Sequence, residues 1–495
     1  MYDSEVARLQ EQIMVIQAEK QQLETQHARI RSFLSPMRRL SNEILLDIFE
    51  YVCEENLLQS YPWFSNKRPL IELTSPVITY LPTMAISSVC SLWRVLALSS
   101  PSLWANIRVE MCTPAQDKAA LVAFVDTVTR YLDRSCDWPL RLSLYIEGIP
   151  SYETEQPFFT SLTQHAHRWK TFAYHGSHSL IDHMTLSELQ FPLLEELDIP
   201  TTYAEKHLFD LGCFKHAPRL CALATTGVPI SKVPHYQLRR LTFQDRFSRL
   251  VEMLYTFPSV ESLELADPDF WDPESSAQYM SRNVKSLNIL QGYHSYLKLL
   301  DLSFNLPSLN TIVLHGYIWG FVTWPTGALI SFISRSSCMI TTFIFRGTPL
   351  SDLELIAALQ VMPSLLHLEI EEYKWATSHF PYSPITSNLI SSLIQHESVS
   401  ISLLVPKLHT LHLVSQRRRT GTFDDSAFVS MVESRWFRPG SDRSAAMSML
   451  GRSCIRSVVL KFEWRELDEE VYKPLRVLDK EGLRVVVAGT NGIQV

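Results

Sequence analysis

Histidines and cysteines are the residues of this chain whose chemistry depends most on spacing, and their spacing favours no reaction. His165 and His167 form one close pair, and His175 and His178 form another. Neither pair is accompanied by a His-Glu-x-x-His motif or by a carboxylate cluster with metal-ligand spacing. The eight cysteines are scattered, with none in the Cys-x-x-Cys spacing of zinc and redox sites. We therefore expect surface histidines, free thiols of a reducing compartment, and neither metal nor cofactor.

Motifs that build other active sites are also missing from the sequence. It has no Gly-x-Ser-x-Gly nucleophile elbow and, with only 15 glycines, no phosphate-cradling glycine loop. Cys90 has no neighbouring signature of an activated thiol, and we expect it to be a core residue. The chain is therefore not expected to be an enzyme, and an enzyme with unrecognised catalytic residues is the alternative.

Composition and charge narrow the class of protein. The chain has 495 residues, 46% hydrophobic and 20% charged, which is ordinary for a globular protein. A net charge of −7 speaks against coating nucleic acid, and the basic run at 417–419 is too short to change that. No apolar stretch approaches the roughly 18 residues that span a bilayer, and the N-terminus lacks signal-peptide features. We expect a cytoplasmic or nuclear protein that binds neither nucleic acid nor membrane.

Residues 1–33 carry apolar side chains in alternating steps of three and four. The seam consists of Val6, Leu9, Ile13, Ile16, Lys20, Leu23, His27, Ile30, Leu34 and Met37. This spacing predicts a heptad helix of the coiled-coil type. A parallel homodimer would set Glu19 against Glu24 of its mate, which is mildly repulsive. Two hypotheses stay open: weak self-association through this helix, or a helix that packs on its own chain or frays in solution.

A second helical block begins after Ser41, which can cap a helix. The apolar residues that follow it are Ile44, Leu45, Ile48, Phe49 and Val52. That stripe is wide enough to serve an internal core and an external partner together. A further helix is expected to carry one apolar side, formed by Ile86, Val89, Trp93, Leu96 and Ala97. Pro101 follows it, and Leu103 and Trp104 begin the next element.

These residues also carry a family resemblance. The matching positions are Leu40, Glu43, Ile44, Leu45, Ile48, Phe49, Val89, Cys90, Trp93, Arg94, Ala97, Pro101, Leu103 and Trp104. Residues 34–110 resemble the F-box, in the form common among fungal F-box-like proteins. The resemblance implies a compact trihelical unit that binds the linker subunit of an SCF-type cullin–RING ubiquitin ligase. The simpler alternative is a pair of core helices without such a partner.

The chain departs from the F-box pattern at three places. Ser41 stands where the family usually has a proline that touches the linker, and Ser91-Leu92 replaces a basic pair. Residues 54–82 separate the two matching halves and are expected to form a loop insertion. Trp93 is expected to hold the trihelical unit together. The resemblance implies linker contacts by Leu40, Ser41, Ile44, Leu45, Ile48 and Phe49, with Leu103 and Trp104 as support.

From Trp169 to Leu460 a six-residue pattern recurs about eleven times, apolar-x-x-apolar-x-apolar. Its units start at Trp169, Leu194, Leu220, Leu238, Val260, Val284, Leu309, Ile340, Leu365, Leu408 and Ile455. Leucine-rich repeats have periods of about 20–29 residues, and most of these gaps are similar. Stretches between the units have helical spacing, so stacked units predict a curved parallel sheet backed by helices. The units resemble the irregular leucine-rich repeats that accompany many F-boxes. A helix at 466–480, a stop at Gly482 and a last strand at 483–487 would form the C-terminal cap.

In each unit, the residue between the last two apolar positions and the residue after the motif should point outward. In the middle units these residues combine apolar and charged side chains, a mixture that suits protein recognition. We expect part of a client-binding surface at Val313, His315, Ile344, Arg346, Glu369 and Glu371. A plain solvated sheet is the alternative.

Together these patterns predict a mixed α+β and α/β chain in three parts. They are a heptad helix at 1–33, an F-box-like domain at 34–110 with its insertion, and a leucine-rich-repeat solenoid with a cap at 111–495. The first hypothesis for function is a substrate-receptor subunit of an SCF ubiquitin ligase, whose partners are the linker, the cullin and a client protein. The second is a protein-interaction scaffold built on the repeats, without any ligase.

Overall fold

A computed structural model describes most of the chain, in segments separated by gaps. The described residues are 2–33, 36–60, 70–113, 117–148, 152–176, 189–199, 211–225, 236–243, 247–266, 279–290, 304–316, 326–347, 350–372, 383–395, 403–416, 423–438 and 440–493. The chain forms two compact units. The first comprises Met1–Glu147 with Glu153–Leu162, and the second comprises Gly148–Tyr152 with Thr163–Val495.

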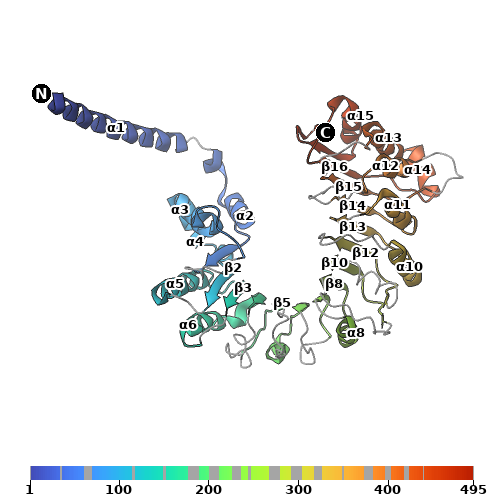
Figure 1. The fold of residues 1–495 in the computed structure, drawn as a ribbon, viewed down its shortest axis with the longest axis horizontal. Helices are drawn as coiled ribbons and strands as arrows, with labels where there is room; N and C mark the ends of the chain where they lie inside the picture. Colours follow the sequence, from blue (N-terminus) through green and yellow to red (C-terminus); the bar gives the residue numbers. More distant parts are fainter. Residues whose placement is uncertain are drawn as a thin grey trace. The chain divides into compact units, whose positions relative to one another are not determined.

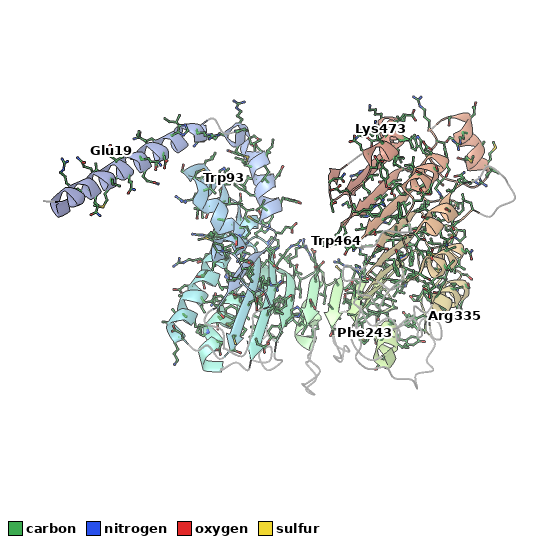
Figure 2. The ribbon with its side chains drawn as sticks, turned by 45° about the horizontal axis from the view of Figure 1, so that its top comes forward. Glu19, Trp93, Phe243, Arg335, Trp464 and Lys473 are labelled. Atoms are coloured by element: carbon green, nitrogen blue, oxygen red, sulfur yellow. The ribbon has the colours of Figure 1, made fainter. Side chains whose placement is uncertain are left out.

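The first unit begins with the long helix α1 (Tyr2–Phe33), where the heptad pattern predicted a helix. All side chains described between residues 8 and 31 are exposed, apolar ones included. Figure 2 shows the side chains of α1, among them Glu19, projecting along its length. Leu34 of the predicted seam lies outside the described residues, and the side chains of Val6 and Leu9 are not described.

Three short helices follow (Figure 1). They are α2 (Asn42–Val52), α3 (Pro82–Val89) and α4 (Ser91–Leu98), with the 3-10 turns η1 (Pro36–Arg39), η2 (Val77–Tyr80) and η3 (Pro101–Trp104). The single helix expected over residues 86–97 is broken at Cys90, whose backbone is extended. Cys90 is half-buried and caps α4, because its Sγ accepts a hydrogen bond from the Trp93 N–H at 3.5 Å. The prediction that Cys90 is a core thiol was therefore wrong.

The strands of the first unit are β1 (Asn56–Gln59), β2 (Asn106–Thr113) and β3 (Leu140–Gly148). Between them and after them lie α5 (Lys118–Arg134) and α6 (Tyr152–Thr163). Residues 54–82, expected to be a loop insertion, contain β1, which pairs in parallel with β2. The pairing is favourable because Leu57 and Leu58 of β1 are buried, and buried Asn56 donates hydrogen bonds to the Leu103 and Asn106 carbonyls. The insertion therefore contributes a strand to the core.

The second unit is built on a large parallel sheet. Its strand order is β4-β5-β6-β7-β8-β10-β12-β13-β14-β15-β16-β17-β18, antiparallel only between β17 and β18. The strands are β4 (Trp169–His175), β5 (Glu196–Ile199), β6 (Ala222–Thr225), β7 (Arg240–Phe243), β8 (Ser262–Ala266), β10 (Ser286–Leu290), β12 (Thr311–His315), β13 (Thr342–Arg346), β14 (His367–Glu371), β15 (Thr410–Ser415), β16 (Ser457–Phe462), β17 (Arg484–Gly489) and β18 (Gly492–Ile493). Each apolar-x-x-apolar-x-apolar unit of the sequence contains one of these strands, so the repeat pattern correctly located the sheet.

Connections between the strands carry helices and a small second sheet. The helices are α8 (Phe247–Thr256), α10 (Thr326–Ser336), α11 (Asp352–Gln360), α12 (Ser387–Leu393), α13 (Asp425–Arg435), α14 (Asp442–Met449) and α15 (Glu469–Lys480), with the turns η4 (Ala166–Arg168) and η6 (Leu211–His216). From α10 to α12, consecutive helices pack against each other along one face of the sheet (Figure 1). In the small second sheet, β9 (Tyr279–Met280) pairs in parallel with β11 (Phe304–Asn305).

The core of the second unit consists of rows of apolar side chains in register. Ile312, Phe343, Leu368 and Leu411 face one another across β12 to β15 and are fully buried. A single strand could not bury such a row, so neighbouring units stabilise each other, as in repeat proteins. Where a C-terminal cap was predicted, α15 is followed by Gly482 in the left-handed region at φ +109° and then by β17. The strand expected to be the last, β17, is followed by the short antiparallel strand β18.

Arg435 of α13 is buried, and its side chain forms hydrogen bonds with three backbone carbonyls. Its guanidinium donates hydrogen bonds to the carbonyls of Leu393, Leu404 and Val405 at 2.6–3.0 Å. Burial, and secondarily the charge of Arg452, lower the pKa of Arg435 to about 9. The side chain therefore satisfies carbonyls at the end of α12 and in the segment before β15, where no helix or strand does so.

Candidate functional site

The α2 helix is the first candidate site, and its sequence explains its position. Ser41 has an extended backbone and accepts a hydrogen bond from the Ile44 N–H at 3.5 Å, which caps the helix. Apolar residues then occupy two adjacent faces of α2, so that the helix cannot bury them all. One face packs inside the first unit and the other meets solvent.

The buried face of α2 holds several residues predicted to contact the linker. Leu45 and Phe49 are each 1% exposed, and the Phe49 ring lies 4.9 Å from the ring of Trp93 on α4. Figure 2 shows Trp93, which is half-buried, among these helices. Leu103 and Trp104 are buried as well, and the Trp104 indole donates to the Ala97 carbonyl at 2.8 Å. Four predicted linker contacts therefore lie in the core of the unit: Leu45, Phe49, Leu103 and Trp104. In this conformation they are not available to contact a partner.

The exposed side of α2 carries a stripe of apolar side chains beside the exposed Glu43, Asp47 and Glu50. Ile44 is 49% exposed, Ile48 37%, Tyr51 80% and Val52 52%. We call these four residues the α2 surface. Of the other predicted contacts, Ser41 is exposed and Leu40 is half-buried. Tyr51 was not predicted to belong to the site, although its position one turn after Ile48 places it on the same face.

Further apolar side chains are exposed on the neighbouring short helices. Val89 at the end of α3 is 60% exposed, and Leu92 and Val95 of α4 are 45% and 64% exposed. Val89 was expected inside the fold, but the break at Cys90 turns it outward. Apolar exposure is ordinary for scattered residues, but several on adjacent short helices are typical of a protein-binding surface.

The second candidate site lies on the sheet of the second unit, where the predicted client-binding residues come together. Val313, Ile344 and Glu369 are direct neighbours across β12, β13 and β14. His315, Arg346 and Glu371 form the next row in the same register. The strand-register argument therefore placed all six residues on one patch of the sheet.

Hydrogen bonds and ion pairs link the polar members of this patch. The Arg346 Nε donates to Glu369 Oε1 at 2.7 Å, and its Nη2 lies 2.6 Å from the same oxygen. Glu369 Oε2 lies 3.8 Å from His367 Nε2 and 3.7 Å from His412 Nδ1. The Gln416 amide donates to Glu371 Oε1 at 2.7 Å. We call this set the strand-face cluster: Arg346, His367, Glu369, Glu371, His412 and Gln416.

Burial within the cluster differs from the expected open surface. Parallel strands lie about 4.8 Å apart, so side chains in one row cover one another. Glu369 is only 9% exposed, whereas Val313, His315, Ile344, Arg346 and Glu371 are half-buried. The expectation that Glu369 faces a client directly is corrected accordingly, and Arg346 and Glu371 are its more accessible neighbours.

Two histidines of this patch, His315 and His412, have a lowered pKa, which favours their neutral form. Burial lowers the pKa of His412, against the opposing effect of Glu369. Burial also lowers the pKa of His315, and the charge of Arg346 lowers it further. Sequence reasoning missed His367, His412 and Gln416, although His412 occupies the same position of the repeat as Glu369, with which it is in register. His367 lies two residues before Glu369 on the same strand and pairs with Thr342.

In the described part of the chain, no group of three or more His, Cys, Asp or Glu side chains is arranged to hold a metal ion. His167 is exposed as predicted, His175 Nε2 lies 3.5 Å from Asp198, and His178 lies outside the described residues, as does the basic run 417–419. Across the described helices, none combines the length and apolarity needed to cross a membrane.

A cavity of about 650 Å³ lies on the helical side of the second unit. Its lining includes Ile356 and Leu359 of α11, Pro363, Leu404 and Arg452. Apolar side chains predominate among the described lining residues, which do not provide the paired acid and base that hydrolytic chemistry would need.

Comparison of the chain with models of known protein families gives no match. Comparison with curated proteins gives none either.

Proposed function

We propose that this protein is a substrate-receptor subunit of an SCF-type cullin–RING ubiquitin ligase. In this proposal the trihelical unit of α2, α3 and α4 is an F-box that binds the linker subunit. The parallel sheet of the second unit is a leucine-rich-repeat array that binds the client protein. The F-box resemblance of residues 34–110 supplies the identity of the ligase, and the geometry of α2 supports it.

The observation that carries the proposal is the α2 surface. A helix of a folded unit that keeps two isoleucines, a valine and a tyrosine in solvent is suited to a partner's apolar groove. Burying each of these aliphatic side chains in an interface would contribute about 1.5–3 kcal/mol. Ser41 does not need to contact the linker for this, since its hydroxyl is used as the α2 cap.

The role of such a subunit is to bring two proteins together. The receptor makes and breaks no bond. It raises the effective concentration of a client lysine near a ubiquitin-loaded enzyme held elsewhere in the complex. Arg346 and Glu371, with the half-buried Val313 and Ile344 beside them, are the residues of the sheet that a client would meet.

The test is recovery of the linker and cullin with the full-length protein. The variant Ile44→Asp, Ile48→Asp places charge on two exposed positions and leaves Leu45 and Phe49 in the core. We expect it to weaken linker binding roughly 100-fold or more, because two buried aliphatic contacts are lost. Val122→Asp on α5 is the control, because Val122 is also an exposed aliphatic residue, at 61% against 49% for Ile44 and 37% for Ile48.

The outcomes separate this function from the alternative. If the wild type recovers linker and cullin, and the α2 variant alone fails while keeping its thermal midpoint, the ligase function is supported. If the wild type recovers neither, the chain is a protein-interaction scaffold built on the repeats. Equal loss in the Val122→Asp control would remove α2 as the site.

A further inference from the structure

The α1 helix carries a second unpartnered surface, which does not involve α2. Its described seam residues are Ile13, Ile16, Lys20, Leu23, His27 and Ile30. Ile13, Ile16, Leu23 and Ile30 are 53–66% exposed. An isolated helix that exposes such a seam is stabilised by a second helix packed along it.

The two polar seam residues indicate which arrangement of helices fits. Lys20 and His27 are one heptad apart, so they share the same position of the repeat. In a parallel, in-register pair each of them would face its own copy, which places Lys20 on Lys20 and repels. The flanking Glu19 would also approach Glu24 of the second copy. Parallel pairing therefore brings like charges together both within the seam and beside it.

Antiparallel pairing removes these conflicts. With Ile13 opposite Ile30 of the second copy, Ile16 faces His27 and Lys20 faces Leu23. At the flanks, Gln10 faces Arg31, Gln17 faces Glu24 and Glu19 faces Gln26, so no like charges meet. The Lys20 ammonium lies 3.7 Å from the Glu24 carboxylate of its own helix. Its aliphatic stem can therefore cover Leu23 of the second copy while its charge stays at the flank.

We propose that α1 pairs in antiparallel orientation with α1 of a second copy of this chain. The proposal does not depend on linker or client binding. Because a helix rises 1.5 Å per residue, the C-terminal ends of the two α1 helices would lie roughly 35 Å apart along the axis. The two copies would then extend from opposite ends of the pair, which gives one assembly two receptors with separate client surfaces.

Cysteine cross-linking in the full-length protein tests the orientation. Ile16→Cys and His27→Cys variants are mixed, oxidised and mapped by peptide mass spectrometry, which distinguishes new links from the native cysteines. Antiparallel pairing predicts a link between residues 16 and 27 of different copies. It predicts no link of residue 16 to itself, since those positions would be roughly 17 Å apart along the axis. Links of 16 to 16 and 27 to 27 would instead show a parallel pair and overturn the proposal.

Two neighbouring substitutions test whether the seam carries the association. Ile16→Asp charges a seam position, whereas Val15→Asp charges an adjacent aliphatic residue outside the seam. The two residues are similarly exposed, Val15 at 54% and Ile16 at 63%. By sedimentation, Ile16→Asp should raise the dimer dissociation constant roughly 100-fold or more, since the lost contact counts twice per dimer. Val15→Asp should change it less than about threefold, as for a surface position. A wild type that stays monomeric, or equal effects of both variants, would refute pairing through this seam.

Discussion

The α2 surface and the strand-face cluster differ in the polarity and in the partners of their side chains outside the core. On α2 the unused residues are aliphatic or aromatic and face solvent without a partner in the described structure. On the sheet the unused residues are charged or polar, and they pair with one another. Apolar residues can lower their free energy only by association, whereas most polar groups of the cluster already have partners within it. Among its described atoms, His412 Nε2 and Gln416 Oε1 are buried without a hydrogen-bond partner. If the proposed function holds, we expect α2 to provide affinity for the linker and the accessible residues of the sheet to provide selectivity for the client.

The largest expected effect is the difference in stability between a core substitution and a surface substitution in the first unit. Trp104→Ala should lower the free energy of unfolding by about 3–5 kcal/mol, because the indole is fully buried and a cavity would remain. The Arg134 guanidinium, 4.4 Å from the Trp104 ring, would also lose its packing partner. Tyr51→Ala on the α2 surface should change stability by less than about 0.5 kcal/mol. Urea unfolding of both variants measures this, and comparable losses would show that Tyr51 belongs to the core.

A smaller effect is expected when the strand-face cluster loses one member. Arg346→Met leaves the buried Glu369 carboxylate without its strongest hydrogen bonds. It should cost about 1–2 kcal/mol, less than a fully buried pair because the Arg346 side chain is 39% exposed. The double variant Arg346→Met, Glu369→Leu should recover most of this loss, since no buried charge remains without a partner.

A double-mutant cycle followed by urea unfolding gives the coupling between Arg346 and Glu369. Glu371→Gln serves as its control, because that side chain is 35% exposed and lies 3.8 Å from Arg346. Additive effects of the two cluster substitutions would show that the ion pair does not stabilise the sheet.

Periodicity located the elements well because burial imposes it. The six-residue pattern found the strands β4 to β16, since alternate residues of each strand must fill one core. The sequence also indicated that α2 has more apolar residues than one core can use. It could not assign Leu45 and Phe49 to the buried face and Ile44 and Ile48 to the exposed one. Which face of α2 is buried depends on where Trp93 and Trp104 pack. It also depends on the strand β1, whose sequence is too short to be distinguished from a loop.

Charge pairing was harder to foresee than burial. Each strand contributes one or two polar residues, and only the register of β13, β14 and β15 brings Arg346, Glu369 and His412 together. Seen singly, such residues resemble solvated surface positions. In the sheet, their rows are close enough to exclude water, which is why a carboxylate predicted to meet a client is nearly buried.

The smallest expected effect is a pH dependence confined to the sheet. Burial lowers the folded-state pKa of His412 below its unfolded value near 6.5, so the unfolded chain binds a proton first as pH falls. The contribution of His412 to stability should therefore be complete above about pH 7 and decrease as pH falls through the unfolded pKa toward the folded one. His412→Asn removes this titration. The thermal midpoint of the wild type, relative to that of the variant, should therefore be lower at about pH 5.5 than at about pH 7.5. His167→Asn, at an exposed position, is the matched control and should show a constant difference. A constant difference for His412→Asn as well would mean that its pKa is the same in both states, and that the cluster does not hold this histidine neutral.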